Sequence, residues 1–464
     1  MSIDEKIAPQ TAFRGGRRID PEYDVVVVGA RCAGAPLATL LARAGLSVVL
    51  LEQARFPRDT MSTHIMEANV LAFLDRLGVT AQVRATGAPY VMRSNVRIDD
   101  LQTRQRIPQI DGDVGGAASV RRFVLDPILV GAAADAGVDV RMGARVTGLL
   151  RNGDRVSGVR VGQDGTSYDV AARLVVGADG RGSTVAELVG SRRYNVAASE
   201  RLGYWGFYEN ADSGPDPELI FHKWDDRLVV AMPADAGLYQ VVEMPVAAER
   251  DAFRADLRGA FDAYARSCGP VARVLTGATL TGKVQGMVRW EGFFREPSGP
   301  GWVLVGDAGH FKDPAPGQGI GDAFRQAEML APEIVAGLAA HDVDERIRVW
   351  GVWRDRDATP MYWTAVDFGK AGPSPLVVAE VARRMVAKGT YDRMLDMFNH
   401  RSDPWRVFTP AVATSATLRM LVRPGAPRRR LLREYRDLAV ADARRKRQLK
   451  RPVYAPSPGP PSRP

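Results

Sequence analysis

The stretch Val25-Val26-Val27-Val28-Gly29-Ala30-Arg31-Cys32-Ala33-Gly34 decides the fold of this 464-residue chain. Its four β-branched residues predict a short buried strand, and the glycines after them predict a tight turn. Residues 35–44 (APLATLLARA) then have the pattern of a helix, and a second apolar run, 48–51, ends at Glu52. Strand, glycine turn, helix and strand form a βαβ unit. We therefore expect an α/β fold.

A glycine turn between a strand and a helix is also the context of a dinucleotide-binding site. Gly29 permits the tight turn, Gly34 lets the helix approach the strand, and the helix N-terminus offers N–H groups to a pyrophosphate. Glu52 stands where a carboxylate can hold a ribose hydroxyl. Arg31 occupies the place of the middle glycine of the fingerprint, so a purely structural glycine turn is the alternative interpretation.

Two further glycine-rich segments follow predicted buried strands. The first, 177–183 (GADGRGS), is by itself an ordinary Asp-Gly turn. The second runs from Gly306-Asp307 through His310 to the loop 314–322 (PAPGQGIGD) and leads into a predicted helix. Glycines there let backbone N–H groups face a ligand oxygen, and an acidic side chain at a strand end can bind sugar hydroxyls.

Together the three motifs, in this order over residues 23–340, resemble the FAD-binding signature of the class A flavoprotein monooxygenases. This is the para-hydroxybenzoate hydroxylase-like superfamily, which also includes geranylgeranyl reductase-like enzymes and flavin-dependent halogenases. The resemblance implies a Rossmann-like FAD-binding domain with an inserted sheet-based substrate domain and a helical C-terminal region. It also implies that 120–126 (VRRFVLD) contains the Arg-x-x-Leu element, and that 58–64 (RDTMSTH) passes near the flavin.

By this resemblance, the first glycine motif lies under the FAD pyrophosphate, Glu52 holds the adenosine ribose and Asp307 holds the ribityl chain. Asp179 would lie near the pyrophosphate, and the amides of 319–321 would face the N1–C2=O edge of the flavin. The predicted cofactor contacts are Gly29, Ala30, Arg31, Ala33, Gly34, Glu52, Gln53, Arg122, Asp179, Gly180, Asp307, Pro314, Gly317, Gly319, Ile320 and Gly321.

The implied function is an FAD-dependent monooxygenase that uses NAD(P)H and O2. It would hydroxylate or epoxidise an aromatic or polyketide-like small molecule through a flavin C4a-hydroperoxide. The Gly-Trp-x-Trp-x-Ile-Pro motif of the halogenases and the reductase motif are absent, which favours monooxygenation. Ala186 stands where the Asp-Gly motif usually has an arginine, which puts direct use of NAD(P)H as a transient reductant in doubt and leaves a separate flavin reductase as an alternative partner.

Two other functions stay open. One is a flavin-dependent reductase or dehydrogenase acting on a carbon–carbon double bond. The other is a non-catalytic nucleotide- or nucleic-acid-binding protein, although the charge pattern argues against nucleic acid. Thirteen of the 63 basic residues lie in 421–464 with only three acidic ones, so the rest of the chain is close to neutral.

Candidate catalytic residues are His64 and His310, in loops that the family places near the flavin, and His222, on a predicted substrate-domain strand. A histidine there can orient a hydroxyl or shuttle a proton, although a lone histidine is more often structural. Residues 203–208 (GYWGFY) are predicted to form a strand whose successive side chains point to opposite faces, with Tyr204 and Tyr208 on one face and Trp205 on the other. Tyr204, Trp205 and Tyr208 are therefore candidate substrate contacts. Ordinary sheet packing explains the same pattern.

Composition indicates a cytoplasmic enzyme. The two cysteines, Cys32 and Cys268, cannot form a disulfide framework, and no metal-ligand spacing occurs. No apolar run is long enough to span a bilayer, and the N-terminus lacks the apolar centre of a secretory signal. The expected domains are a flexible leader (1–22), a discontinuous FAD-binding domain (23–195 and 296–345), a substrate domain (196–295) that strands at 85–115 could join, a helical C-terminal region (346–423) and a basic, Pro-rich tail (424–464).

Overall fold

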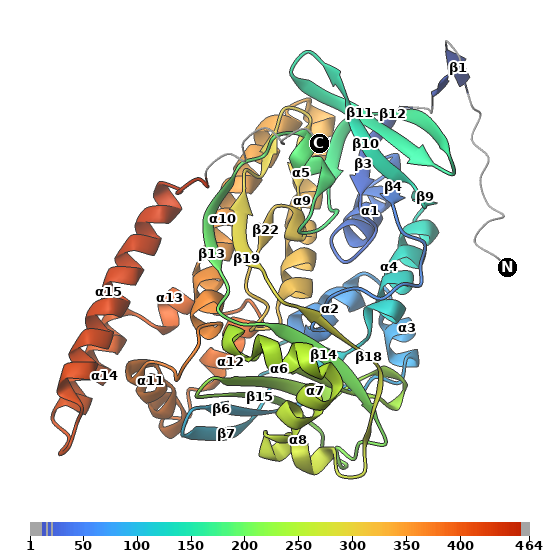
Figure 1. Cartoon of the computed structure of the whole chain (residues 1–464). Helices are drawn as coiled ribbons and strands as arrows, with labels where there is room; N and C mark the ends of the chain where they lie inside the picture. Colours follow the sequence, from blue (N-terminus) through green and yellow to red (C-terminus); the bar gives the residue numbers. More distant parts are fainter. Residues whose placement is uncertain (1–11, 15–16, 20–21, 456–464) are drawn as a thin grey trace.

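The protein is described from a computed structural model, which covers residues 12–14, 17–19 and 22–455 (Figure 1). Most of the predicted leader (1–22) and the end of the tail (456–464) lie outside the described residues. Figure 1 shows two main sheets, one above the other, with helices around both and a group of C-terminal helices along one side.

The first sheet is the predicted α/β core, and its central strands run parallel. Their order is β9 (Asp139–Met142), β4 (Val48–Glu52), β3 (Tyr23–Val28), β12 (Thr166–Gly177) and β21 (Trp302–Leu304). The edges are extended by β1 (Ala12–Arg14), β2 (Arg17–Ile19) and β20 (Ser298–Gly299). The strands predicted at 25–28 and 48–51 are confirmed, since side chains buried on both faces produce continuous apolar runs.

Different layers cover the two faces of this sheet. Val25 and Val27 pack against α1 (Gly34–Arg43), α4 (Arg122–Asp135) and α9 (Gly319–Ala340). Val26 and Val28 point the other way, as the two-residue period of a strand requires. They pack against α5 (Thr184–Leu188) and the hairpin of β10 (Arg145–Asn152) and β11 (Arg155–Gln163), which turns at Gly153 and Asp154.

The second sheet has seven strands in the order β18, β14, β17, β16, β15, β6, β7. Their bounds are Thr279–Met287, Gly203–Glu209, Tyr239–Glu243, Arg227–Pro233, Glu218–Trp224, Arg93–Ile98 and Leu101–Arg106. The segment 93–106 therefore pairs with strands that lie more than a hundred residues later in the chain. This pairing places two distant segments of the chain in one sheet.

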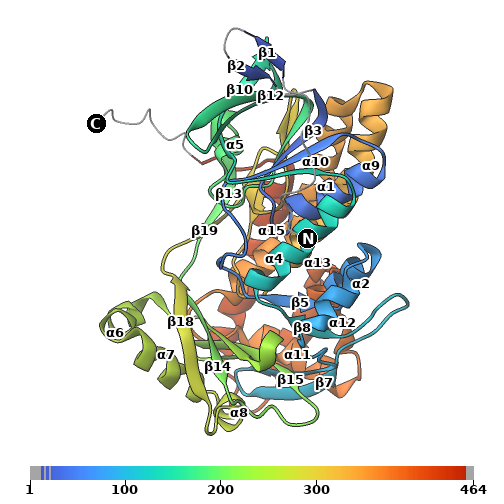
Figure 2. The ribbon, with the colours of Figure 1, turned by 90° about the vertical axis from the view of Figure 1, so that its right-hand side faces the viewer.

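Three short helices cover the outer face of the second sheet (Figure 2). They are α6 (Arg250–Ala255), α7 (Leu257–Arg266) and α8 (Gly269–Val274). Asp256 interrupts the run with a non-helical backbone, and its carboxylate accepts a hydrogen bond from the Gly259 N–H at 2.9 Å. A side chain of this kind at a helix start favours a new helix over continuation of the old one.

Smaller elements lie between the two sheets (Figure 2). One group is a three-stranded sheet of β13 (Arg193–Ala198), β19 (Glu291–Arg295) and β22 (His310–Phe311). Another pairs β5 (Ile65–Glu67) with β8 (Ala117–Ser119) and is followed by α2 (Ala68–Arg76) and α3 (Thr80–Ala85). These connections carry the chain from the first sheet to the second.

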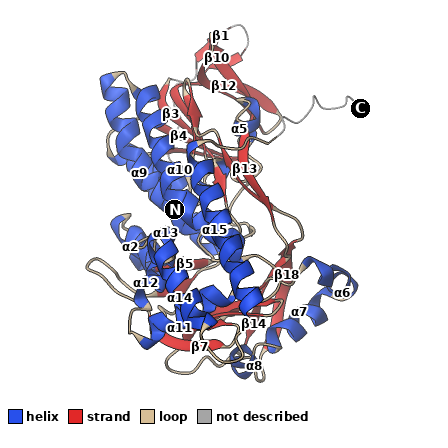
Figure 3. Cartoon of the chain, turned by 90° about the vertical axis from the view of Figure 1, so that its left-hand side faces the viewer, coloured by secondary structure: helices blue, strands red, loops and turns tan. Residues whose placement is uncertain are grey.

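The C-terminal region is helical, as predicted, and packs along both sheets (Figure 3). It consists of α10 (Val343–Phe368), α11 (Leu376–Ala387), α12 (Asp392–Phe398), α13 (Pro404–Val407), α14 (Pro410–Leu421) and α15 (Arg428–Lys450). The basic helix α15 is anchored by the buried Leu431 and by an ion pair between Arg445 and Asp367 at 2.6 Å. Within the described ranges, no helix is both long and apolar enough to cross a membrane.

Candidate active site

A cavity of about 570 Å³ opens beyond the carboxyl ends of β3, β4 and β12. This edge is where ligands bind in open α/β sheets. The predicted cofactor contacts that line it are Gly29, Arg31, Ala33, Glu52, Gln53, Arg122, Asp179, Gly180, Asp307, Pro314, Gly317, Gly319 and Ile320. The folding of the chain thus brings all three glycine motifs to one cavity. The other three contacts are not in its lining: Ala30 and Gly34 belong to the glycine turn, and Gly321 lines a separate hollow with His400.

The first glycine turn has no room for side chains. Gly29 has a φ of +100°, and a Cβ added to it would lie 2.5 Å from the carbonyl oxygen of Ala178. A Cβ on Gly34 would lie 1.8 Å from the carbonyl oxygen of Gly29. Glu52 holds the turn against β4, since its carboxylate accepts a hydrogen bond from the Ala30 N–H at 3.0 Å. Both glycines are therefore required by backbone packing as well as by access to a ligand.

Arg31 replaces the middle glycine of the fingerprint without its side chain facing the turn. Its guanidinium pairs with the fully buried Asp126 at 2.6 Å and lies over the ring of Phe56. Asp126 also accepts a hydrogen bond from Nε of Arg122 at 2.6 Å. One buried carboxylate therefore holds the guanidinium groups of Arg31 and Arg122, which both line the cavity. This pairing is the structural explanation of the departure from the fingerprint.

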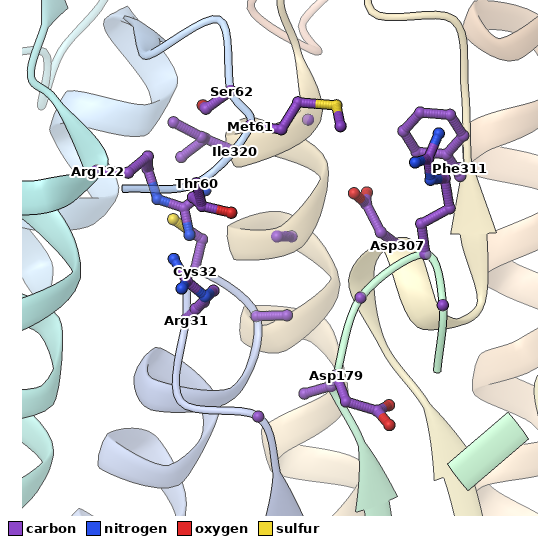
Figure 4. A pocket seen from close by; sticks show the side chains of 18 of the residues that line it. Arg31, Cys32, Thr60, Met61, Ser62, Arg122, Asp179, Asp307, Phe311 and Ile320 are labelled. Atoms are coloured by element: carbon purple, nitrogen blue, oxygen red, sulfur yellow. The ribbon is translucent and has the colours of Figure 1, made fainter. Parts of the chain in front are cut away.

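Arg122, the predicted Arg-x-x-Leu residue, is the first residue of α4. Its backbone N–H donates a hydrogen bond to Nδ1 of His64 at 3.1 Å. Burial, and then the positive charge of Arg122, lower the pKa of His64 to about 3. His64 is therefore neutral and accepts a hydrogen bond from the helix terminus. Apart from Nε, no hydrogen bond engages the Arg122 guanidinium among the described residues, and in Figure 4 the group points into the cavity.

Asp179 and Asp307 face the same cavity but differ in their partners (Figure 4). The Asp179 carboxylate accepts hydrogen bonds from the Ser183 hydroxyl at 2.5 Å and the Val185 N–H at 3.2 Å, which fixes the turn into α5. The Asp307 carboxylate has no hydrogen bond or ion pair within the part of the chain that the structure describes. Burial, and then the charge of Asp322, raise the pKa of Asp307 to about 6.

These residues fit FAD. An unpartnered carboxylate inside a cavity needs hydrogen-bond donors, and the ribityl chain of FAD carries several hydroxyls. The free side of Arg122 and the N-terminus of α1 suit a pyrophosphate. A Cβ added to Gly180 or Gly319 would meet no atom within 4 Å, so the backbone is open to a ligand at both positions.

A buried charged network next to the third glycine motif was not predicted. The Lys312 ammonium donates to Oε1 of Gln318 at 2.9 Å and pairs with Asp322 at 2.8 Å. His400 lies on the other side of Asp322, with its Nε2 at 2.8 Å. The positive charge of Lys312 and the hydrogen bond from His400 hold the pKa of Asp322 well below its usual range despite burial. The charged residues 312–313, which lie between the two parts of the motif, were the sequence signal available for this network. No sequence pattern around His400 indicates its part in the network.

A second, apolar cavity of about 70 Å³ adjoins the first. The two share lining residues: Thr63, Val242, Met244, Pro314 and Gly317. The rest of the apolar lining comes from the second sheet and from the C-terminal helices, and includes Val230, Phe221, Phe368, Tyr391, Met394 and Phe398. No motif marks the C-terminal contributors, so sequence reasoning placed no site residue there.

The three predicted substrate residues on β14 are separated by the alternation of the strand. Trp205 faces the large cavity. Tyr204 and Tyr208 face the helices on the outer side, where Tyr204 stacks on Phe253 at 4.6 Å and the Tyr208 hydroxyl donates to Asp262 at 3.0 Å. Of the three, only Trp205 is therefore placed to meet a ligand in that cavity.

None of the three predicted catalytic histidines is in the lining of either cavity. The Nε2 atom of His222 lies 3.0 Å from Oδ1 of Asn95. His310 is 2% exposed, packs on Phe294 at 4.6 Å between ring centroids and has no hydrogen bond on either ring nitrogen. Burial lowers the pKa of His310 to about 3. Their catalytic roles stay predictions.

A third hollow, rich in arginine, lies beside the large cavity. Its cationic lining residues are Arg181, Arg193, Arg201, Arg250, Arg289 and Arg295, and the only acidic one is Glu291. Glu291 pairs with Arg193 at 3.4 Å, and the other five arginines pair with no carboxylate among the described residues. Arg181 lines both this arginine groove and the large cavity. The lining of the groove therefore contains more positive than negative side chains and lies next to the candidate flavin site.

The comparisons with known proteins agree with an FAD-binding site. Residues 22–233 match the family described as "FAD binding domain". The 6-methylpretetramide 4-monooxygenase of Streptomyces rimosus is 27% identical over 339 residues, which cover 70% of this chain and 78% of that protein. The tryptophan 2-halogenase of Chondromyces crocatus is 26% identical over 69% of this chain, but the match spans only 62% of its own length.

Solved structures support the fold. The flavin-dependent brominase Bmp2 superposes with a TM-score of 0.69, at 20% sequence identity, over 86% of this chain and 99% of its own. At that identity the likeness concerns the fold alone.

Proposed function

Because residues 22–233 match an FAD-binding domain and a monooxygenase is 27% identical over 70% of this chain, we propose that the protein is an FAD-dependent monooxygenase of small molecules from the para-hydroxybenzoate hydroxylase-like superfamily. It would use FAD, a nicotinamide nucleotide and O2 to hydroxylate or epoxidise an aromatic or polyketide-like substrate. The observation that carries this proposal is the meeting of two cavities at the loop 314–317, one lined by the glycine motifs and charged side chains and fitted to FAD, the other lined mainly by apolar side chains.

Within this proposal, bound FAD would supply the redox and oxygen-activating chemistry, and the protein supplies binding, orientation and exclusion of water. Asp307 would accept hydrogen bonds from the ribityl hydroxyls, and Arg122 would face the phosphates. The amides at the start of α9 would face the part of the flavin that gains negative charge on reduction. The Lys312–Asp322 pair would hold that loop in place.

The apolar cavity supports an apolar, aromatic substrate. Three phenylalanines line it, Phe221, Phe368 and Phe398, and they contact one another with ring centroids 6.0–6.1 Å apart. Apolar walls with few polar groups are typical of small-molecule sites. They also keep water away from the reacting centre, which oxygen transfer needs because an unprotected reduced flavin–oxygen adduct decays to hydrogen peroxide.

The arginine groove supports direct reduction by a nicotinamide nucleotide. A dinucleotide carries two or three phosphate groups, and guanidinium groups bind phosphate through paired N–H donors. Because Arg181 lines both sites, a nucleotide whose phosphates lie in the groove can place its other end at the flavin. The groove supports direct reduction even though the arginine usual in the Asp-Gly motif is replaced by Ala186.

The first test is spectroscopic. We expect the purified protein to show a flavin absorbance spectrum that NADH or NADPH bleaches without oxygen and that air restores. Turnover under ¹⁸O2 should then add one labelled oxygen atom to the product. A product without oxygen but with a reduced double bond would support the reductase alternative instead. Protein that holds no FAD even after reconstitution would contradict the whole assignment.

The second test concerns the groove. Arg250 and Arg289 are exposed and form no ion pair with any described carboxylate. Arg250→Gln and Arg289→Gln should each raise the nicotinamide KM by about ten-fold and weaken its dependence on salt, while FAD binding is unchanged. Arg433→Gln, on the exposed side of α15, is the matched control. Unchanged KM in both groove variants, with flavin still reducible by a separate reductase, would favour the partner-reductase alternative.

A further inference from the structure

Glu67 is a buried carboxyl group at the wall of the apolar cavity. It ends β5, directly before α2, and is 6% exposed. Its Oε2 atom is buried and has no hydrogen-bond partner among the described residues. Its side chain lines the apolar cavity and is absent from the lining of the large one. A polar atom without a partner in an apolar wall is costly, so it calls for a ligand that satisfies it.

The surroundings of Glu67 place it close to the junction of the two cavities. A Cβ added to Gly317, which lines both cavities, would lie 3.8 Å from Oε1 of Glu67. The nearest charged groups, Lys312 and Asp322, are paired with each other at 2.8 Å. The phenol of Tyr391 is the other titratable group in the same cavity lining. Glu67 itself forms no ion pair with any described residue.

The electrostatics favour the neutral form of this group. Burial raises the pKa of Glu67 to about 8, the charge of Asp322 adds to the rise and the charge of Lys312 opposes it. Below about pH 8 the side chain is a carboxylic acid with one O–H donor, and above it the donor is lost. At neutral pH, Glu67 can therefore donate a hydrogen bond into a cavity that contains few other donors.

We propose that Glu67 binds the substrate by donating a hydrogen bond to an acceptor oxygen, such as a ketone, on an otherwise apolar ring system. The inference rests on the proposed function, because it specifies the ligand of the same site. A cavity of about 70 Å³ is smaller than the ~150 Å³ that holds one benzene. Only the oxygen-bearing edge of the substrate therefore enters it, and the remaining rings extend past Gly317 into the large cavity.

A pair of small probes tests this directly in the FAD-bound protein. 1-Tetralone has a carbonyl that can only accept a hydrogen bond, and tetralin is the same bicyclic molecule without the oxygen. Equilibrium dialysis measures their binding without turnover and without a flavin signal. We expect the protein to bind 1-tetralone about ten-fold more tightly than tetralin at about pH 6.5, because one buried hydrogen bond is gained.

The variants separate a binding role from a merely structural one. Glu67→Gln keeps an N–H donor and should keep the preference for 1-tetralone, but at every pH. In the unmodified protein the preference should disappear above about pH 8, as the carboxyl ionises. Glu67→Leu should show no preference at any pH. The control is Glu243→Gln, which changes a second buried, unpartnered carboxyl that lines neither cavity and should behave like the unmodified protein.

The outcomes are distinct from those of the functional test. A preference for 1-tetralone that survives in Glu67→Leu would overturn the inference, as would equal binding of both probes by the unmodified protein at about pH 6.5. A preference that persists unchanged above pH 8 would show that the carboxyl is not the donor. None of these results depends on flavin reduction or on oxygen transfer, so they leave the monooxygenase proposal to its own experiment.

Discussion

The substitution Asp307→Asn should have opposite effects on the protein without FAD and on the affinity for FAD. Without the cofactor, Asp307 is a carboxylate that no described side chain or N–H group satisfies. A pKa of about 6 in place of 3.8 corresponds to ~3 kcal/mol of unfavourable ionisation free energy. Because water in the cavity screens part of this penalty, we expect the flavin-free variant to be more stable by about 1–2 kcal/mol near neutral pH.

The sign of the pH dependence follows from the raised pKa. The penalty is absent below about pH 4, where Asp307 is protonated in both states, and is complete above about pH 6. The stability gain of Asp307→Asn should therefore grow as the pH rises between these values. FAD affinity should fall, because hydrogen bonds to a charged acceptor contribute about 1.5–3 kcal/mol, or roughly ten- to a hundred-fold in Kd.

Urea unfolding of flavin-free protein at several pH values, and quenching of FAD fluorescence on binding, measure the two effects. Asp313→Asn is the matched control in the same loop, since Asp313 accepts hydrogen bonds from Trp290 Nε1 at 3.1 Å and the Ala315 N–H at 3.0 Å. An amide can satisfy only one of these donors, so this variant should lose about 1–3 kcal/mol at every pH. The reasoning would be refuted if Asp307→Asn destabilised the flavin-free protein or left the FAD Kd unchanged.

Two further substitutions test the first glycine motif. Gly29→Ala should lower the free energy of unfolding by at least ~2 kcal/mol and abolish flavin retention, because the φ of +100° and the 2.5 Å approach of the Ala178 carbonyl oxygen exclude a methyl group. The flavin content of the purified variant measures this effect, and a normal content would contradict it. Asp126→Asn should cost at least ~2 kcal/mol in urea unfolding, since the single amide oxygen can accept from only one of Arg31 and Arg122 and the amide nitrogen would face the other guanidinium group; a loss below ~0.5 kcal/mol would show that the two guanidinium groups find other partners.

The flavin-binding part of the fold was predictable because its signals are local. A buried parallel strand, a glycine with positive φ and a helix start are decided within about ten residues, so the pattern at 25–34 indicates the βαβ unit without any knowledge of the rest. The glycines of the other two motifs work in the same way. The local pattern is less informative at 249–267, where a single polar residue, Asp256, divides a helical stretch into two separate helices.

The rest of the site had no local signal. Glu67, Phe398 and His400 lie in ordinary sequence contexts, and only packing brings Glu67 to the same region as the other two, which lie more than three hundred residues later in the chain. Even the alternation at 203–208 predicted two faces for the strand but not which one meets the cavity. That choice depends on which side the helices α6–α8 cover, which is a property of the assembled sheet.

By itself, then, the sequence determined the α/β class, the FAD signature and the carboxylates at the strand ends. These features depend on residues that are neighbours in the sequence, since a strand, the turn after it and the side chain at its end are consecutive. Three features were decided only by the tertiary structure. The Arg31 side chain turns away from the glycine turn to pair with Asp126, certain aromatic side chains line a cavity, and Glu67 Oε2 has no hydrogen-bond partner among the described residues. Burial and charge pairing arise between segments tens to hundreds of residues apart, so the free energies that set these features exist only once the chain is folded.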